Sequence, residues 1–490
     1  MFTLQSLLIS LVLLFSHYAY SSPWIAVGDA RLKNDLHLLN DSGAMPISLT
    51  TWPIMWADVK SAIDKFESTD PKIELNAAQK SALKELKFEL NYQTHQGFKE
   101  SVTVQADTSR TLFRNFASSH RERGELTQEL AWDGERLSGN LQTNLTPGTG
   151  NSDRDVEVQF DGSYVAGVLG EWVLGFGAID RWWGGGSQSS LILTNNARPV
   201  PALIFRTKST QHFETPLLAW IGNWQFVSFL GQLESDRTIS KGKLIGMRFT
   251  FKPLPYLEFG LSRAMQWGGA NRDESFKAFL KSLSSKGENT SSKSGNQLGG
   301  FDVRYNFKVR ELSLALYSQM IGEDEAGYMP AKYTFQFGAE SFYALKGGNV
   351  LKSFIEYNNT FAGALGGRHP NVAYEHSVFQ TGYRYRGRVM GASVDNDSKV
   401  YSLGGAYQQT DGQLSSFTIN YMQLNVDGSA GGNTVSLDAK NLFYFELNHQ
   451  MFLLGGQFNV GASYQSKGLN TPQKGINQTA VFTSWKYRFK

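Results

Sequence analysis

The chain has 490 residues, 47 basic and 44 acidic, so its formal net charge is only +3 and no strong positive field points to nucleic acid as a partner. It has no cysteine, which excludes disulfides and thiolate metal sites. Its 49 glycines, 33 phenylalanines and 20 tyrosines favour strands, tight turns and aromatic surfaces. The mean hydropathy of −0.32 excludes a bundle of membrane helices but leaves a transmembrane β-barrel open, because barrel strands alternate apolar and polar residues.

The N-terminus is typical of a secretory signal. An apolar run from Leu7 to Phe15 is followed by Ala19-Tyr20-Ser21, which places small residues for cleavage before Ser22. We therefore expect residues 1–21 to be a signal peptide that is removed on export.

Helical spacing of apolar residues characterises the next segment. It recurs around residues 32–39, 56–66 and 83–90, and Asn76 is placed to cap the third helix. The sequence thus predicts a helical module over residues 22–96, at the periplasmic mouth of the domain formed by the rest of the chain.

Strict alternation begins at about residue 97 and continues to the C-terminus. Val303, Tyr305 and Phe307, for example, alternate with polar neighbours. Strands of ten or more residues repeated over nearly 400 residues exceed the ordinary soluble length and match a tilted strand crossing a bilayer. We expect residues 97–490 to form an outer-membrane β-barrel in contact with lipid and lipopolysaccharide.

The spacing of the connections gives a strand count. Short turns, such as Asp133-Gly134 and Asp411-Gly412, interleave with long polar connections, which is typical of periplasmic turns and external loops. Counting from both ends gives eighteen antiparallel strands, or twenty if residues 362–398 hide a hairpin. The aromatic last strand ending at Phe489 resembles the signal read by the outer-membrane assembly machinery, which we expect as a partner during biogenesis.

Three long external segments carry the candidate binding residues: 181–199, 268–296 and 362–398. Sugars are bound by flat aromatic faces, planar amides and guanidinium groups. The candidate residues, within these segments or directly beside them and including one carboxylate, are Asp180, Arg181, Trp182, Trp183, Gln188, Asn195, Asn196, Arg198, Trp267, Tyr383, Arg384, Arg386 and Arg388. Alternatives stay open: the tryptophans suit an interfacial girdle, Asp180-Arg181 a structural ion pair, and the three arginines, on one face of an extended segment, a lumen ladder paired with Asp or Glu.

A short helix is expected inside the second external segment. Phe276, Phe279, Leu280 and Leu283 form an apolar stripe at helical spacing, within residues 271–285. We expect this helix to bury the stripe against other loops and to help close the barrel.

Catalytic patterns are weak. Gly185-Gly186-Ser187 lacks the second glycine of a nucleophile elbow, no H-E-x-x-H occurs, and the eight histidines are scattered. We expect no catalytic residues, no metal site, no cofactor and no enzymatic activity.

Six strings carry a family resemblance: SLTTWPIMWADV, DRWWGGGSQSSLILTNNARPVPAL, GLSRAMQWGG, NVAYEHS, GYRYRGR and DNDS. In these strings and their order the chain resembles the capsule assembly protein Wzi family. The resemblance implies an outer-membrane barrel of a Gram-negative bacterium, with a periplasmic helical bundle, that binds capsular polysaccharide and organises it at the cell surface.

The sequence therefore predicts a monomeric outer-membrane lectin for an acidic capsular polysaccharide. A porin or polysaccharide exit channel is the alternative, because an eighteen-stranded barrel conducts if nothing fills it. A surface hydrolase is a third.

Overall fold

The computed structural model describes residues 23–68, 74–118, 120–147, 156–283, 295–326, 329–364, 367–429 and 432–489. The expected signal peptide lies outside these residues. In the described part of the chain, no helix combines the length and the apolar character that a membrane span requires.

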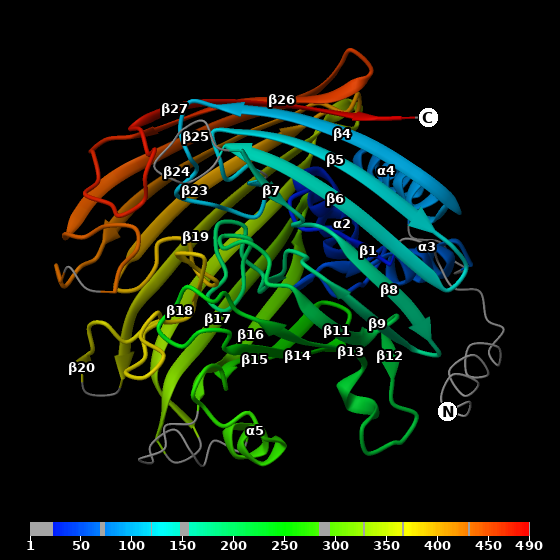
Figure 1. Cartoon of the computed structure of the whole chain (residues 1–490). Helices are drawn as coiled ribbons and strands as arrows, with labels where there is room; N and C mark the ends of the chain where they lie inside the picture. The colour runs from blue at the N-terminus through cyan, green and yellow to red at the C-terminus, as the bar shows by residue number, and fades with distance from the viewer. Residues whose placement is uncertain are drawn as a thin grey trace.

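Long antiparallel strands close into one barrel, in which the last strand pairs with the first (Figure 1). Eighteen strand positions result, because β7 and β8 both pair with β6, β11 and β12 both pair with β13, and β20 (Gly367–Arg368) only extends the hairpin of β19. The prediction of eighteen strands is confirmed. In chain order the wall strands are β4 (Gly97–Asp107), β5 (Gly124–Asp133), β6 (Leu137–Pro147), β7 (Val156–Gln159), β8 (Tyr164–Leu169), β9 (Trp172–Gly177), β11 (Ala202–Thr207), β12 (Gln211–His212), β13 (Asn223–Gln232), β14 (Lys243–Leu254), β15 (Leu257–Trp267), β16 (Gly295–Val309), β17 (Leu312–Ala326), β18 (Met329–Ala344), β19 (Val350–Ala364), β23 (Lys399–Gln408), β24 (Leu414–Leu424), β25 (Lys440–Leu453), β26 (Gly456–Gln465) and β27 (Thr479–Arg488).

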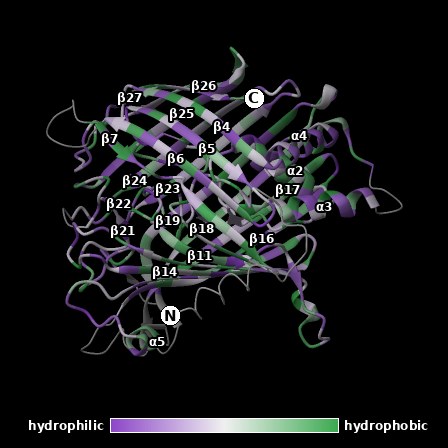
Figure 2. Cartoon of the chain, turned by 45° about the vertical axis from the view of Figure 1, so that its right-hand side comes forward, coloured by the Kyte–Doolittle hydropathy of each residue, from purple (hydrophilic) through white to green (hydrophobic). Residues whose placement is uncertain are grey.

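Hydrophilic and hydrophobic residues alternate along the wall strands, as the bands of colour show (Figure 2). Along β14, Arg248 points into the lumen and is buried, whereas its neighbour Phe249 stacks with Trp224 on the outer face. Arg248 donates two hydrogen bonds, of 2.6 and 2.9 Å, to the carboxylate of Asp302 on β16. The polar face is therefore inside and the apolar face outside, as a bilayer requires.

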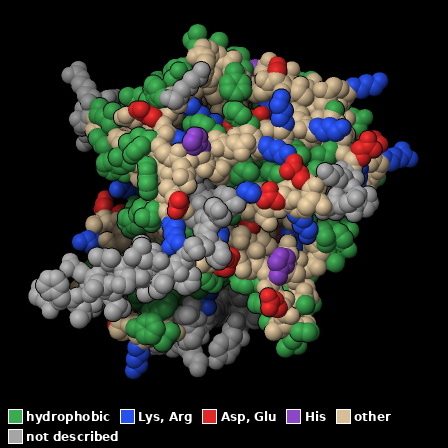
Figure 3. Space-filling view, turned by 90° about the vertical axis from the view of Figure 1, so that its right-hand side faces the viewer, with side chains coloured by type: hydrophobic (Ala, Val, Ile, Leu, Met, Phe, Trp, Pro, Cys, Tyr) green, Lys and Arg blue, Asp and Glu red, His purple; other side chains and the backbone are tan. Residues whose placement is uncertain are grey.

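The connections divide the barrel into two ends. One end, here the short-turn end, carries tight turns such as Gly134 and Gly412, where the sequence predicts them. The other, the long-loop end, carries the long connections. Figure 3 looks onto the short-turn end, where Lys and Arg side chains stand beside Asp and Glu.

The N-terminal segment fills and covers the short-turn end. Its helices are α2 (Ala30–Asp41), α3 (Trp56–Ser68) and α4 (Ala77–Thr94), joined by the short strands β1 (Trp24–Ile25), β2 (Thr51–Trp52) and β3 (Ile54–Met55). Asn76 caps α4 in a reciprocal pair of hydrogen bonds with Gln79, as its spacing predicts. Helix α2 lies inside the barrel, where Asp41 accepts two hydrogen bonds from Arg304 of β16.

The helix expected in the second external segment forms as α5 (Phe276–Leu283), but it does not bury its stripe. Phe276 and Leu280 are 72% and 46% exposed, and Phe279 contacts Trp267 at the edge of the wall. The expectation that this helix closes the barrel is therefore wrong. Periodicity places an apolar stripe on one face of a helix but does not say what covers it.

Candidate functional site

The connection between β9 and β11, residues 178–201, folds into the lumen. Trp182 and Trp183 form β10 (Trp182–Trp183), which pairs with Trp52 and Thr51 of β2. The two tryptophan side chains are 0% and 1% exposed, and Trp182 donates its indole N–H to the Gly186 carbonyl at 3.1 Å. This stretch therefore joins the long-loop end to the N-terminal segment instead of lying on the surface.

The glycine and serine run of this connection wraps a carboxylate of the wall. Glu356 of β19 accepts hydrogen bonds from the backbone N–H groups of Ser187, Gln188 and Ser189, at 2.9, 3.2 and 3.0 Å. A Cβ on Gly186 would lie 2.1 Å from the Ser189 carbonyl oxygen, so only glycine fits this close turn. The three successive donors form an anion-binding nest that fixes the connection to the wall.

A second connection, residues 369–398, is held by Arg384. Its guanidinium donates to both carboxylate oxygens of Asp395, at 3.0 and 2.6 Å, and to Glu375 at 2.5 Å. Arg384 and Asp395 are buried, so the pair is a bidentate clamp shielded from solvent. Burial raises the pKa of Glu375 to about 7, with a smaller contribution from Asp395 and Asp397, although Arg384 opposes the shift.

The expected arginine ladder is wrong, because this segment turns back on itself. Arg384 lies in β21 (Arg384–Tyr385) and Arg388 in β22 (Arg388–Val389), and Arg386 and Gly387 form the turn between them with φ of 49° and 77°. Arg384 consequently points inward, whereas the Arg386 side chain is 47% exposed and has one 3.4 Å contact, with Glu157.

Basic residues from three connections meet on the surface of the long-loop end. Arg110 donates its backbone N–H to the Gly475 carbonyl at 2.9 Å, and a Cβ on Gly475 would lie 3.3 Å from the Arg123 guanidinium. Gln473 donates to the Gly387 carbonyl at 3.0 Å, which brings the Arg386 turn to the same place. We call Arg110, Arg123, Arg386, Arg388 and Lys474 the external basic patch.

Charge in this patch is only partly compensated. Arg110 forms a two-pronged ion pair with Glu122, with both distances 2.5 Å. Burial, and then the neighbouring charges of Arg121 and Arg110, lower the pKa of Arg388 to about 10, so it stays charged at neutral pH. Arg123, Arg386 and Lys474 are exposed. The patch can therefore present guanidinium and ammonium donors to anionic groups in solution.

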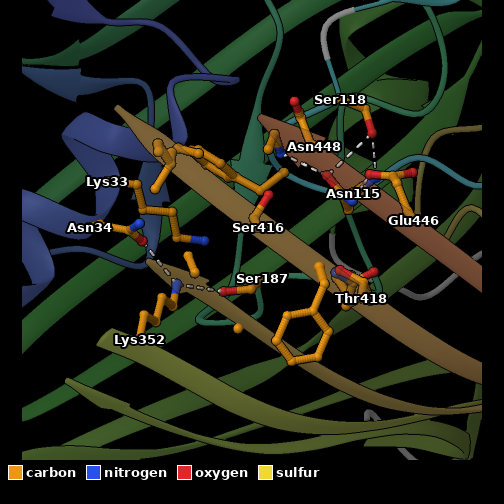
Figure 4. A pocket seen from close by; sticks show the side chains of 18 of the residues that line it. Lys33, Asn34, Asn115, Ser118, Ser187, Lys352, Ser416, Thr418, Glu446 and Asn448 are labelled. Atoms are coloured by element: carbon orange, nitrogen blue, oxygen red, sulfur yellow. Dashed lines mark hydrogen bonds between the residues drawn. The ribbon is translucent and has the colours of Figure 1, made fainter. Parts of the chain in front are cut away.

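Two cavities lie between the inner segments and the wall. One, of about 90 Å³, adjoins α2; in it Lys352 donates to Asn34 at 3.2 Å and to Ser187 at 3.3 Å (Figure 4). The other, of about 480 Å³, follows the inner face of β4, β5 and β6 and includes Glu125 and Glu129. Residues of α2 and of the connection 178–201 line parts of both cavities.

One group in the described chain has the composition of a metal site. Ligand atoms of His37, Asp41 and Glu340 lie within 4.8 Å of one another. The Arg304 guanidinium, however, donates to both carboxylates at 2.7 Å, and His37 lies 2.6 Å from Glu340. A cation already stands among the acidic groups, so the cluster is an ion-pair network that ties α2 to β16 and β18.

The structure separates the predicted site residues into three groups by their burial. Buried residues with partners inside the protein are Arg181, Trp182, Trp183, Asn195, Asn196, Tyr383 and Arg384. Because these side chains are buried, a polymer at the surface cannot contact them, and in this structure they hold the connections that close the long-loop end of the barrel. Half-buried residues with protein contacts are Asp180, Gln188, Arg198, Trp267 and Arg388, and Arg386 is exposed.

Sequence reasoning missed Arg110, Arg123 and Lys474. The first two lie in the long connection over residues 108–124, which the turn spacing places at the long-loop end, and the third precedes the last strand. The sequence feature that could have indicated them is the recurrence of basic residues in the connections of the long-loop end. Only the barrel closure, which pairs β27 with β4, brings these connections together.

Comparisons with known proteins agree with this architecture. The family model of the capsule assembly protein Wzi matches residues 71–481. A Klebsiella pneumoniae protein described as an uncharacterized 55.8 kDa protein in the cps region is 30% identical over 348 residues, or 69% of this chain and 65% of that protein, slightly under two thirds of its length. The solved structure of Wzi from Escherichia coli, described as an outer-membrane protein involved in group 1 capsule assembly and as a carbohydrate-binding β-barrel, superposes with a TM-score of 0.83 at 25% identity, covering 95% of this chain and 99% of that one.

Proposed function

The chain belongs to the capsule assembly protein Wzi family, and on that premise we propose that it is a non-enzymatic outer-membrane lectin that binds capsular polysaccharide and anchors it at the cell surface. In this proposal the long-loop end faces the outside and the helices of the short-turn end face the periplasm.

One observation carries the proposal: the long-loop end is closed by inward-folded connections and carries the external basic patch. Arg386 and Arg123 present exposed guanidinium groups on a frame fixed by the buried Arg384 clamp and the Glu356 nest. Guanidinium forks match carboxylates, so the patch favours a polysaccharide with acidic sugars. The carbohydrate binding described for the Escherichia coli relative supports the same function.

A binding assay tests the patch. Arg123→Ala combined with Arg386→Ala should weaken retention of the purified protein on immobilised acidic capsular polysaccharide. Exposed charge contacts contribute about 0.2–1 kcal/mol each, so we expect roughly a 2- to 30-fold loss of affinity for the double variant. Raised salt should weaken the wild type in the same direction. The matched control is Lys87→Ala on α4, an exposed basic residue at the opposite end. Equal retention of the double variant and the control would remove the patch from the binding surface.

The channel alternative has its own readout. The inner segments that fill the lumen favour a closed barrel over a conduit. Planar-bilayer conductance of the wild type at the level of a general porin would overturn that closure and favour transport instead.

A further inference from the structure

The connection between β12 and β13, residues 213–222, is an apolar projection at the short-turn end. Figure 1 shows it in green, extending away from the barrel wall. Leu217 and Trp220 are 82% and 64% exposed, Leu218 is also exposed, and Glu214 is its only charged residue. Large apolar side chains exposed together on a projection indicate a surface that meets an apolar phase or a partner.

The projection is continuous with the lipid-facing wall. Trp220 packs edge-on against Phe251 at 6.3 Å, and Phe213 stacks on Trp224 at 4.9 Å. Trp224 lies on the outer face, because its neighbour Gln225 points inward and donates to Asp58 at 2.5 Å. The connection therefore extends the outer aromatic surface of the barrel sideways, at the level where aromatic rings form an interfacial belt.

Backbone pairing within the connection suits the same environment. A short 3₁₀ turn, η1 (Ala219–Ile221), is closed by hydrogen bonds from the Ala219 and Leu218 N–H groups to the Thr215 carbonyl, both 3.0 Å. The Ile221 N–H donates to Leu218 at 3.0 Å, and the Gly222 N–H to Ala219 at 3.1 Å. Because these donors are satisfied inside the turn, it can enter a region poor in water without leaving them unpaired.

We propose that residues 213–222 are a lateral lipid anchor, which inserts Leu217, Leu218 and Trp220 among the glycerophospholipids next to the barrel. The leaflet depends on the proposed orientation: the short-turn end faces the periplasm, so the anchor meets the periplasmic leaflet. A periplasmic protein partner is disfavoured, because the projection offers one charged group and its rings continue the lipid-facing surface.

The absence of cysteine from the chain makes a direct test simple. Leu217→Cys carries a nitroxide label in the full-length protein, reconstituted in vesicles of phosphatidylethanolamine and phosphatidylglycerol. Collisional broadening by oxygen, which partitions into lipid, should exceed broadening by a water-soluble nickel chelate by at least several-fold. The matched control is Asp411→Cys, on an exposed turn of the same end, where the nickel chelate should dominate.

Two outcomes overturn the anchor. Nickel access at residue 217 equal to that at residue 411 places the connection in water. Protection of residue 217 from both reagents, in vesicles that contain only this protein, indicates contact between two copies. Retention of the labelled protein on capsular polysaccharide is read separately, because residue 217 lies at the end opposite the basic patch, so failure of the anchor and failure of the lectin proposal are distinguishable.

Discussion

Replacing Arg384 by alanine should loosen the closure of the long-loop end without unfolding the barrel. The change removes three charge-assisted hydrogen bonds and leaves Asp395 buried without its counter-ion. Removing one partner of a buried ion pair costs about 3–5 kcal/mol. Asp395 keeps two donors from Thr434, at 2.9 and 2.6 Å, so we take the lower figure. About 3 kcal/mol corresponds to a roughly 150-fold larger opening equilibrium for residues 371–398.

Hydrogen–deuterium exchange with mass spectrometry measures this opening directly. Peptides from 371–398 should exchange roughly 150-fold faster in Arg384→Ala, while the β16 and β17 peptides keep their wild-type protection, because the wall does not depend on the clamp. The control is Arg386→Ala, two residues away and exposed, which should change exchange by less than about threefold. Exchange in Arg384→Ala within threefold of the wild type, or an equal effect of Arg386→Ala, would refute the distinction between clamp and patch.

Three further predictions concern the interior of the barrel and the connection 369–398. Trp182→Ala should cost about 3–5 kcal/mol, because it empties a fully buried site, and should lower the temperature at which the barrel unfolds on a heat-modifiability gel; an unchanged transition would contradict its role between β2 and β10. Burial raises the pKa of Glu375 in the folded connection 369–398 to about 7, above its ordinary value of 4.5, so the folded state binds this proton more tightly. The resulting stability of the connection should be complete below about pH 4.5 and lost as the pH rises towards 7. Hydrogen exchange of residues 371–398 should lose this pH dependence in Glu375→Gln. Arg304→Met leaves Asp41 buried without a counter-ion, whereas Glu340 keeps Lys352 at 3.3 Å, so the hold of β16 on α2 should weaken and bilayer conductance should rise. Wild-type conductance in a folded variant would show that α2 is held by other contacts.

The wall could be predicted from the sequence because a strand in a bilayer has one apolar and one polar face. Alternation depends only on neighbouring residues, as at Arg248 and Phe249, so the strand count needed no knowledge of distant contacts. The ends of the strands are marked by the glycines and polar residues of the turns. This part of the fold is local, so the sequence pattern predicts the number of strands. It does not predict that β7 has 4 residues and that β8, β9 and β11 have 6 each, where ten or more were expected.

The candidate site was less predictable, because the same residue types serve surfaces and interiors. Trp182 and Arg384 are of residue types that suit a sugar site, but whether they are buried depends on partners that the sequence pattern does not reveal. Trp182 pairs with Trp52, 130 positions earlier, and Arg384 binds Asp395, 11 positions later. Arg386 is exposed whereas Arg384 is buried, because the chain reverses direction in a turn with positive φ at Arg386 and Gly387. Side-chain type thus predicted which connections matter, whereas burial decided which residues within them face solvent.

An eighteen-stranded wall is too wide for its own side chains to fill, so closure depends on segments that enter from both ends. Those segments need polar partners, because the inner face of the wall is polar. The sequence supplies them as carboxylates and guanidinium groups on the strands: Glu356 holds the connection 178–201, and Arg304 holds α2. The pairing of β10 with β2 then joins the connection 178–201 to the N-terminal segment, since Trp182 pairs with Trp52 inside the barrel. If the chain has the proposed function, an interior closed in this way would hold the charges of the basic patch at a fixed spacing, and a polysaccharide with regularly repeating acidic sugars would bind without first ordering the surface.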